Sequence, residues 1–144
     1  MIRFADRLYS SNEPLNPIKQ DEKKGKLRVV ALPYPFNYGA FSQTWERIDA
    51  KDHDTGYEGD NDPIDVCEIS GKTFKTGDVV QVKILGTYAM IDEGQTDWKI
   101  LAIDVNDPDA AKFNNSGDIP KDITDRVFTF LRDYKVCLTP LPPR

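Results

Sequence analysis

The chain has 144 residues, of which 39% are hydrophobic and 30% charged, and its net charge is -5. The length suits one domain, and the composition excludes a disordered or fibrous chain. The negative charge disfavours nucleic acid and anionic membranes as partners, and no apolar run approaches the roughly 18 residues of a membrane helix.

The sequence also indicates a compartment. The first residues lack the apolar core of a secretion signal, and Asp6 and Glu13 interrupt an Arg- and Ser-containing stretch that faintly resembles a mitochondrial presequence. Cys67 and Cys137 lie 70 positions apart, without the CxxC spacing of a zinc site. We therefore expect a cytoplasmic protein rather than a mitochondrial one, with no disulfide framework.

The first half of the chain contains two candidate strands. Residues 27–32 are rich in β-branched side chains and end at Pro33. Residues 37–39, Asn-Tyr-Gly, predict a loop. Residues 64–69 alternate in character and predict a second strand.

The second half predicts a β-hairpin followed by a helix. Residues 78–90 form the clearest strand, with a bend or bulge at Gly86, and residues 98–104 are its natural partner. Apolar side chains at spacings of three and four predict a helix over residues 123–134, capped near Asp122. The core-facing side chains of the long strand are expected to be Val80, Val82 and Ile84. These elements favour a mainly β fold, a small antiparallel barrel or curled sheet with one helix.

The acidic residues are unevenly distributed. From Asp52 to Asp65 there are six acids and no Lys or Arg, and from Asp92 to Asp109 there are six acids against Lys99 alone. The two segments together carry -11, so the rest of the chain carries +6. Such clusters are either solvated acidic loops or a cation site.

The first acidic segment contains a DxDxxD motif, Asp60-Asn61-Asp62-Pro63-Ile64-Asp65, at the entry to a predicted strand. Because Pro63 disfavours helix before it, the carboxylates are presented together at the strand end. Oxygen ligands at this density suit a hard divalent cation, Mg²⁺ before Mn²⁺ or Ca²⁺. The motif is not an EF-hand, since Asp65 stands where that loop needs glycine and Gly71 where it needs glutamate.

The second acidic segment adds Asp92 and Asp97, with Lys99 two residues further on. In an extended chain Asp97 and Lys99 point to the same face, which would place a carboxylate for metal beside an ammonium for an anion. These are the parts of metal-assisted phosphoryl transfer. His53 has no evident partner for nucleophilic catalysis, and the residues alone leave an acidic interaction module as an equal alternative.

Several motifs, in order along the chain, resemble family I soluble inorganic pyrophosphatases, most closely the eukaryotic branch. The two acidic motifs are Gly59-Asp60-Asn61-Asp62-Pro63-Ile64-Asp65-Val66 and Ala89-Met90-Ile91-Asp92-Glu93-Gly94-Gln95-Thr96-Asp97-Trp98-Lys99. Further matches include Asn37-Tyr38-Gly39-Ala40, Gln43-Thr44-Trp45-Glu46 and Arg132-Asp133-Tyr134-Lys135-Val136.

The resemblance implies hydrolysis of pyrophosphate to two phosphates with Mg²⁺, or alternatively Mn²⁺. It also implies an OB-like five-stranded antiparallel β-barrel with a flanking helix, which need not be complete here, and a homodimer. Asp62 would deprotonate the attacking water, with Tyr38 and Lys99 as further catalytic residues. The implied metal ligands are Asp60, Asp65, Asp92 and Asp97. The implied substrate-binding residues are Arg28, Tyr38, Lys99, Tyr134 and Lys135.

The resemblance stops short of both ends. Residues 13–136 are the pyrophosphatase-like catalytic domain. Residues 1–12 are a divergent segment that lacks the family's N-terminal glutamate ligand and phosphate-binding lysine, and residues 137–144 are an unrelated tail. Tyr34 stands near the place of a further family tyrosine. The alternative function is therefore a truncated, catalytically impaired relative that binds metal or a partner without turnover.

Overall fold

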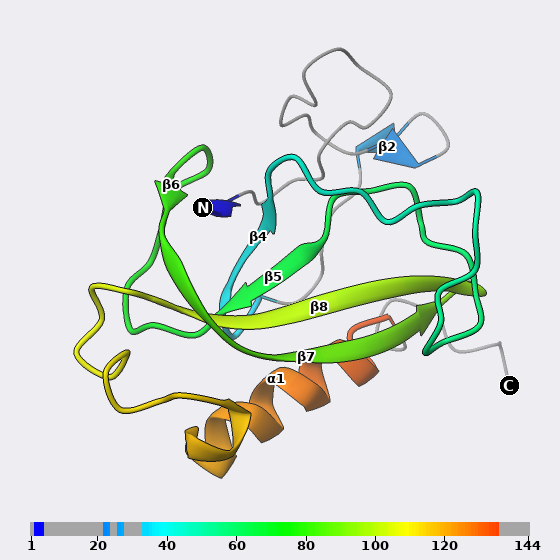
Figure 1. Cartoon of the computed structure of the whole chain (residues 1–144). Coiled ribbons are helices and arrows are strands. Elements are labelled where there is room, and N and C mark those ends of the chain that lie inside the picture. The colour runs from blue at the N-terminus through cyan, green and yellow to red at the C-terminus, as the bar shows by residue number, and fades with distance from the viewer. Residues whose placement is uncertain (1, 5–21, 24–25, 28–32, 136–144) are drawn as a thin grey trace, which may run out of the picture.

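The computed structural model describes residues 2–4, 22–23, 26–27 and 33–135 (Figure 1). Arg28, Cys137 and most of the strand expected over residues 27–32 lie outside the described residues. The same holds for most of segment 1–12 and for all of segment 137–144.

A long antiparallel hairpin forms the centre of the fold. Strand β7, Val82–Asp92, pairs along its length with β8, Gln95–Asp104, which confirms the predicted hairpin. Glu93 and Gly94 connect the strands with positive φ angles of 49° and 87°. Two consecutive positive φ angles match the twist of a tight hairpin turn.

The remaining strands extend this hairpin into one six-stranded sheet with the order β6-β1-β4-β5-β8-β7. The other members are β1 Ile2–Phe4, β4 Asn37–Phe41, β5 Asp65–Glu68 and β6 Val79–Val80, and a separate pair is β2 Glu22–Lys23 with β3 Lys26–Leu27. The pairing between β5 and β8 is parallel, so the sheet is mixed where the sequence predicted an antiparallel one. The mainly β architecture with one helix is confirmed, and the sheet formed by the described residues is not closed into a barrel.

The predicted loop over residues 37–39 is wrong, because these residues lie in β4. Strand β4 pairs with β5, and Tyr38 stands opposite Cys67. The turn-like composition of Asn-Tyr-Gly is overridden by sheet pairing on both sides of the strand, since β1 also pairs with it.

The long strand predicted over residues 78–90 divides into β6 and β7 around Gln81. The register against β8 shifts between Ile84 and Gly86, which confirms the predicted bulge. Leu85 is 5% exposed and packs in the core with Leu101 and Ile103, whereas Ile84 is 54% exposed. The prediction that Ile84 is a core residue is therefore wrong: Ile84 stands opposite Ala102, on the same face as Val80 and Val82, but at a position that the described residues leave exposed. The bulge changes the alternation of side chains only from Gly86 onward.

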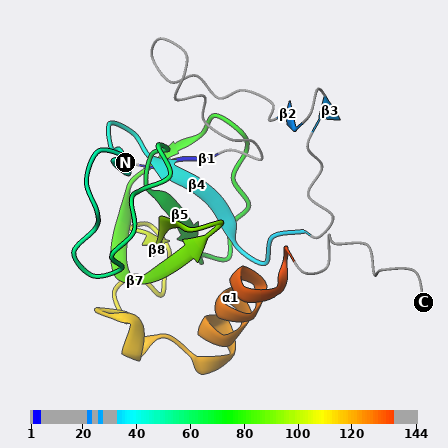
Figure 2. The same ribbon diagram turned by 90° about the vertical axis from the view of Figure 1, so that its right-hand side faces the viewer.

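One helix covers a face of the sheet, as Figure 2 shows beneath β7 and β8. Helix α1, Lys121–Asp133, follows a short 3-10 turn, η1 Ser116–Asp118, and begins after Pro120 rather than at the predicted cap Asp122. Proline suits this position because a helix start needs no donor there. The core beneath the helix contains Phe36, Cys67, Leu85, Leu101, Ile103, Val127 and Leu131.

The alternation of β8 decides where its charged residues lie. Leu101 and Ile103 pack in the core against the helix, and Asp97 and Lys99 belong to the same face because side chains two apart share a face. The charged end of this face therefore lies beside the last turn of α1, where Lys135 contacts Asp92.

Candidate active site

Lys99 lies at the centre of the candidate site and is 3% exposed. Its Nζ donates to Asp97 Oδ1 at 2.5 Å, and also to Asp65 Oδ2. The parallel register of β5 and β8 places Asp65 directly opposite Lys99. The predicted shared face of Asp97 and Lys99 is confirmed, and the parallel pairing adds a second carboxylate that local sequence does not reveal.

Tyr38 extends this group from the neighbouring strand β4. Its hydroxyl donates to Asp65 Oδ2 and accepts from Lys99 Nζ at 3.3 Å. Burial, together with the charge of Asp65, raises the pKa of Tyr38 well above its ordinary value. The phenol is therefore a hydrogen-bond donor at neutral pH.

The two carboxyl groups beside Lys99 are difficult to ionise. Burial raises the pKa of Asp65 and of Asp97, and the ammonium of Lys99 offsets only part of this. Burial alone would lower the pKa of Lys99, but the same two carboxylates outweigh it and raise that pKa. Positive charge is held strongly at this position, and the site has an excess of carboxylates over cations.

The end of β7 and the end of α1 meet at a second ion pair. Lys135 Nζ contacts Asp92 Oδ2. Tyr134 stacks on Phe130, with ring centroids 5.4 Å apart. Burial raises the pKa of Tyr134 to about 12. The described members of the implied substrate-binding set thus all lie on the face of the sheet that α1 covers.

The loop that carries Asp60 and Asp62 is fixed by hydrogen bonds. The backbone N–H of Asp62 donates to Asp60 Oδ1 at 2.9 Å, and Trp45 Nε1 donates to Asn61 Oδ1 at 2.9 Å. Asn61 takes a positive φ of 75°, a conformation that asparagine tolerates better than most residues. Burial raises the pKa of Asp60. The loop therefore holds a half-buried carboxylate toward the sheet.

Glu46 is a site residue that the sequence did not identify. It is 6% exposed, and its Oε1 accepts the backbone N–H of Trp98 at 2.8 Å. Its Oε2 is buried without a hydrogen-bond partner among the described residues. Burial and the nearby charge of Asp60 raise the pKa of Glu46 to about 8. Its position in the Gln43-Thr44-Trp45-Glu46 motif was the only signal that could have found it.

Three carboxyl groups converge at one point. One oxygen from each of Glu46, Asp60 and Asp97 lies within 4.8 Å of the others. An all-oxygen donor set that includes a buried, unpartnered oxygen suits a hard divalent cation. Of the predicted metal ligands, Asp60 and Asp97 belong to this cluster. Asp65 lies outside it and shares Lys99 with Asp97, and Asp92 is paired with Lys135.

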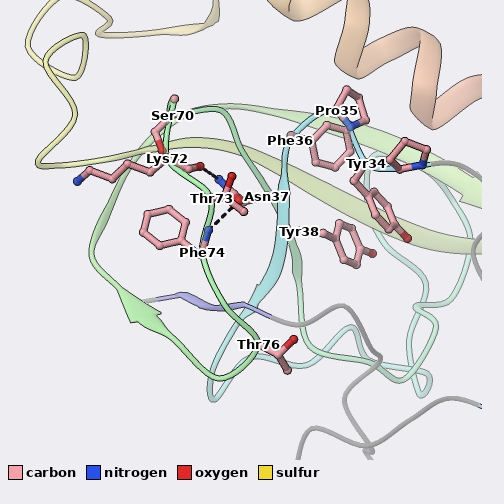
Figure 3. Close-up of a pocket in the computed structure, with 12 residues that line it drawn as sticks. Tyr34, Pro35, Phe36, Asn37, Tyr38, Ser70, Lys72, Thr73, Phe74 and Thr76 are labelled. Atoms are coloured by element: carbon pink, nitrogen blue, oxygen red, sulfur yellow. Dashed lines mark hydrogen bonds between the residues drawn. The ribbon is translucent and has the colours of Figure 1, made fainter.

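A pocket of about 530 Å³ lies on the other side of Tyr38 (Figure 3). Its aromatic wall comes from Tyr34, Phe36 and Tyr38, and its opposite wall comes from the loop over residues 70–76. Tyr34 and Tyr38 stack with ring centroids 5.0 Å apart. Tyr38 is therefore shared between this pocket and the acidic site, whose carboxylates do not line the pocket.

Residues 15–140 match the family model described as inorganic pyrophosphatase. The chain belongs to the inorganic pyrophosphatase family. The pyrophosphatase of Dictyostelium discoideum is 55% identical over 130 residues, and that of Homo sapiens is 51% identical over 135 residues. Both alignments cover 88% of this chain and 47% of the relative, so the chain spans about half the length of these curated relatives.

Solved pyrophosphatases share the fold. The inorganic pyrophosphatase of Schistosoma japonicum superposes with a TM-score of 0.84 at 43% identity, covering 96% of this chain and 52% of that one. A vacuolar soluble pyrophosphatase of Trypanosoma cruzi, solved in complex with PPi, gives 0.86 at 39% identity, covering 99% and 58%. Among the described residues, no helix is both long and apolar enough to span a bilayer.

Proposed function

We propose that this chain hydrolyses inorganic pyrophosphate to two phosphates with the help of a divalent cation, Mg²⁺ or Mn²⁺. The observation that carries the proposal is the buried Lys99, held between Asp65 and Asp97 and next to the carboxylates of Glu46 and Asp60. An ammonium for phosphoryl oxygens and oxygen ligands for cations are the two components that such a reaction needs.

The proposed division of work follows the implied roles. The cations would be held by Asp60, Asp65, Asp92 and Asp97. When bound, they would neutralise charge on the phosphoryl oxygens and lower the pKa of bound water. The phosphoryl oxygens are bound by five side chains, those of Arg28, Tyr38, Lys99, Tyr134 and Lys135. A carboxylate can contact Lys99 and a cation together, because it accepts through two oxygens.

Asp62 accepts the proton of the attacking water in this proposal. The oxygen of that water forms a bond to one phosphorus, and the bridging P–O bond breaks toward the other phosphate. Asp62 is half-buried, and its backbone N–H donates to the carboxylate of Asp60, so Asp62 is held in the same fixed loop as that member of the metal cluster. General bases of this kind contribute about 10²- to 10⁴-fold to the rate.

Phosphate release from pyrophosphate tests the proposal. With Mg²⁺ we expect turnover by the unmodified chain and a loss of about 10²- to 10⁴-fold for Asp62→Asn. Asp54→Asn is the matched control, because Asp54 is an exposed acid of the same region that contacts His53. Equal rates for the chain and Asp62→Asn, or metal binding without any turnover, would contradict the proposal.

The remaining assignments stay predictions. These are a cytoplasmic location, a homodimer and a catalytic domain over residues 13–136. Size-exclusion chromatography with light scattering would test the dimer.

A further inference from the structure

Glu46 reaches the metal cluster from a segment outside the predicted site. Both the N–H and the C=O of Glu46 form backbone hydrogen bonds to the loop of the DxDxxD motif. Glu46 N donates to Asp62 O at 2.8 Å, and Asn61 N donates to Glu46 O at 3.0 Å. Gly59 N also donates to Arg47 O at 2.8 Å. The position of Glu46 is therefore fixed relative to Asp60 by several backbone hydrogen bonds, not by the side chain alone.

The side chain of Glu46 is only half satisfied by the protein. Oε1 accepts from the backbone N–H of Trp98, the residue between Asp97 and Lys99. Oε2 is buried and has no hydrogen-bond partner within the described part of the chain. A buried carboxylate oxygen without a partner is costly, so such atoms are rare unless a ligand or ion completes them.

The surroundings of this oxygen select the kind of ligand. Glu46, Asp60 and Asp97 offer oxygens within 4.8 Å of one another, and Lys99 donates to Asp97 and Asp65. Oxygens that bind one Mg²⁺ ion lie about 3 to 4 Å apart, so small side-chain adjustments would bring these three onto one ion. A divalent cation would both complete Oε2 and offset the like charges.

We propose that Glu46 is a direct ligand of a divalent cation that Asp60 and Asp97 also bind. This proposal deepens the proposed function, because it adds a ligand to the same metal site. Glu46 has a structural role as well, through its hydrogen bond to Trp98 N–H. An experiment must therefore separate ligation from charge and from position.

Two substitutions separate these roles. Glu46→Gln keeps an oxygen for Trp98 N–H but removes the charge and one carboxylate oxygen. Glu46→Asp keeps the charge but withdraws the carboxylate by one methylene. Glu58→Gln is the matched control, because Glu58 is an exposed glutamate whose side chain undergoes the same chemical change.

The measurement is Mn²⁺ binding to the whole chain, followed by the electron paramagnetic resonance signal of free Mn²⁺. A ligand role predicts that both Glu46 variants raise the Mn²⁺ dissociation constant about tenfold or more, while Glu58→Gln changes it less than about twofold. Circular dichroism of each metal-free variant shows that it is folded before binding is compared.

The other outcomes overturn the proposal in different ways. A loss of affinity in Glu46→Gln alone would mean that Glu46 acts by long-range charge. A loss in Glu46→Asp alone would mean that it only positions Trp98. Unchanged binding in both would exclude any role toward the metal. Tight Mn²⁺ binding without hydrolysis in the unmodified chain would instead contradict the proposed function and leave this inference standing.

Discussion

At the scale of single residues, the site depends on a close backbone approach. A Cβ added to Gly59 would lie 2.4 Å from the carbonyl carbon of Glu46 and 2.8 Å from Arg47 O. These are backbone atoms that cannot rotate away. The glycine therefore allows segment 44–47 to lie against the loop that carries Asp60 and Asp62.

We predict that Gly59→Ala lowers the free energy of unfolding by about 2 to 3 kcal/mol, because the added methyl forces the two segments apart. Urea denaturation measures the change. Gly71→Ala is the control, since a Cβ there has no atom within 4 Å and the change should stay within about 0.5 kcal/mol. Equal midpoints for the two variants would contradict the steric argument.

Most of the acidic site residues, but not Glu46, can be predicted from the sequence. Asp97 and Lys99 share a face because of simple strand alternation, and the DxDxxD motif marks Asp60 and Asp65 by spacing alone. Glu46 is different, because it is one acid in an irregular segment. Its role comes from long-range backbone pairing and burial, which no local pattern encodes.

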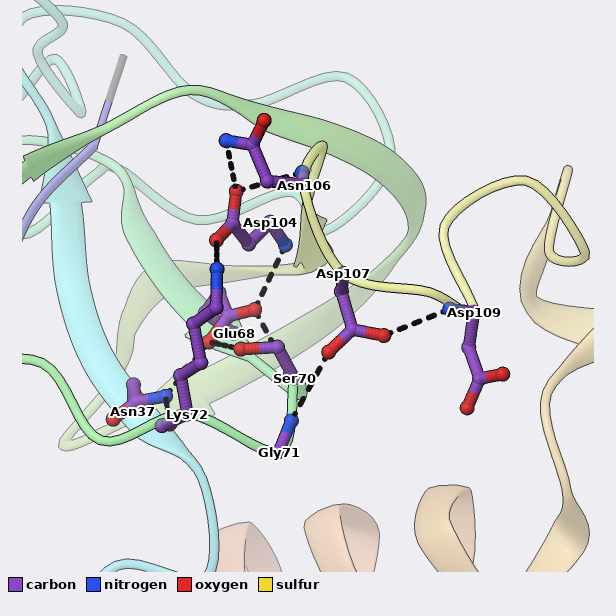
Figure 4. Close-up of polar contacts among 9 residues, drawn as sticks. All are labelled: Asn37, Glu68, Ser70, Gly71, Lys72, Asp104, Asn106, Asp107 and Asp109. Carbon is purple, nitrogen blue, oxygen red and sulfur yellow. Dashed lines mark hydrogen bonds and ion pairs between the residues drawn. The ribbon is translucent and has the colours of Figure 1, made fainter.

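At the scale of elements, a buried carboxylate joins three strands and a loop (Figure 4). Glu68 in β5 is 0% exposed, and it accepts hydrogen bonds from Asn37 in β4, Ser70 in the following loop, and the backbone of Asp104 in β8. Lys72 then donates to Asp104 Oδ2 at 2.8 Å. The network fixes the ends of the strands that carry Tyr38, Asp65 and Lys99.

We predict that Glu68→Gln costs about 2 kcal/mol of stability, because the amide presents a donor to one of the groups that now donate to Glu68. Thermal and urea unfolding give the change, and Glu58→Gln at an exposed position is the reference. A loss below about 0.5 kcal/mol would mean that the network contributes little to the fold.

Among the elements, those formed by local sequence are predicted, and those formed by distant segments are not. The β7–β8 hairpin and the helix follow from local periodicity, and both were predicted. The parallel pairing of β5 with β8 was not, because it joins segments that are distant in sequence and leaves no turn signal. The change of alternation after Gly86, which sends Tyr88 and Met90 to the helix-covered face, depends on the position of the bulge, which Gly86 indicates but does not fix.

At the scale of the whole molecule, the net charge of -5 conceals a local excess of carboxyl groups around Lys99. Burial raises the pKa of Asp60, Asp65 and Asp97. In the absence of metal, the folded chain therefore holds these carboxyl groups close together in surroundings that disfavour their charged form. Lys99 neutralises part of this charge. Cations bound to the folded chain should supply the rest.

We predict that 10 mM Mg²⁺ raises the thermal unfolding midpoint by several degrees relative to EDTA, since a ligand present at 100 times its dissociation constant adds about 2.7 kcal/mol. Differential scanning calorimetry is the measurement, and NaCl at equal ionic strength controls for screening. Asp97→Asn should abolish most of the increase. An increase that NaCl reproduces would show general screening instead of a bound ion.

The two outer strands of the sheet, β6 and β7, are separated in the chain only by Gln81, whose carbonyl accepts from Val105 N–H at 3.1 Å. The continuous segment that contains β6 and β7 thus forms both outer strands of the sheet. The sheet must curl for one segment to reach both of its edges. Exposed sheet edges are where a strand of another molecule can add and begin aggregation. Among the described residues, the curl brings only the beginning of β7 close to β6, so the rest of this 11-residue strand remains the edge to which a foreign strand could add.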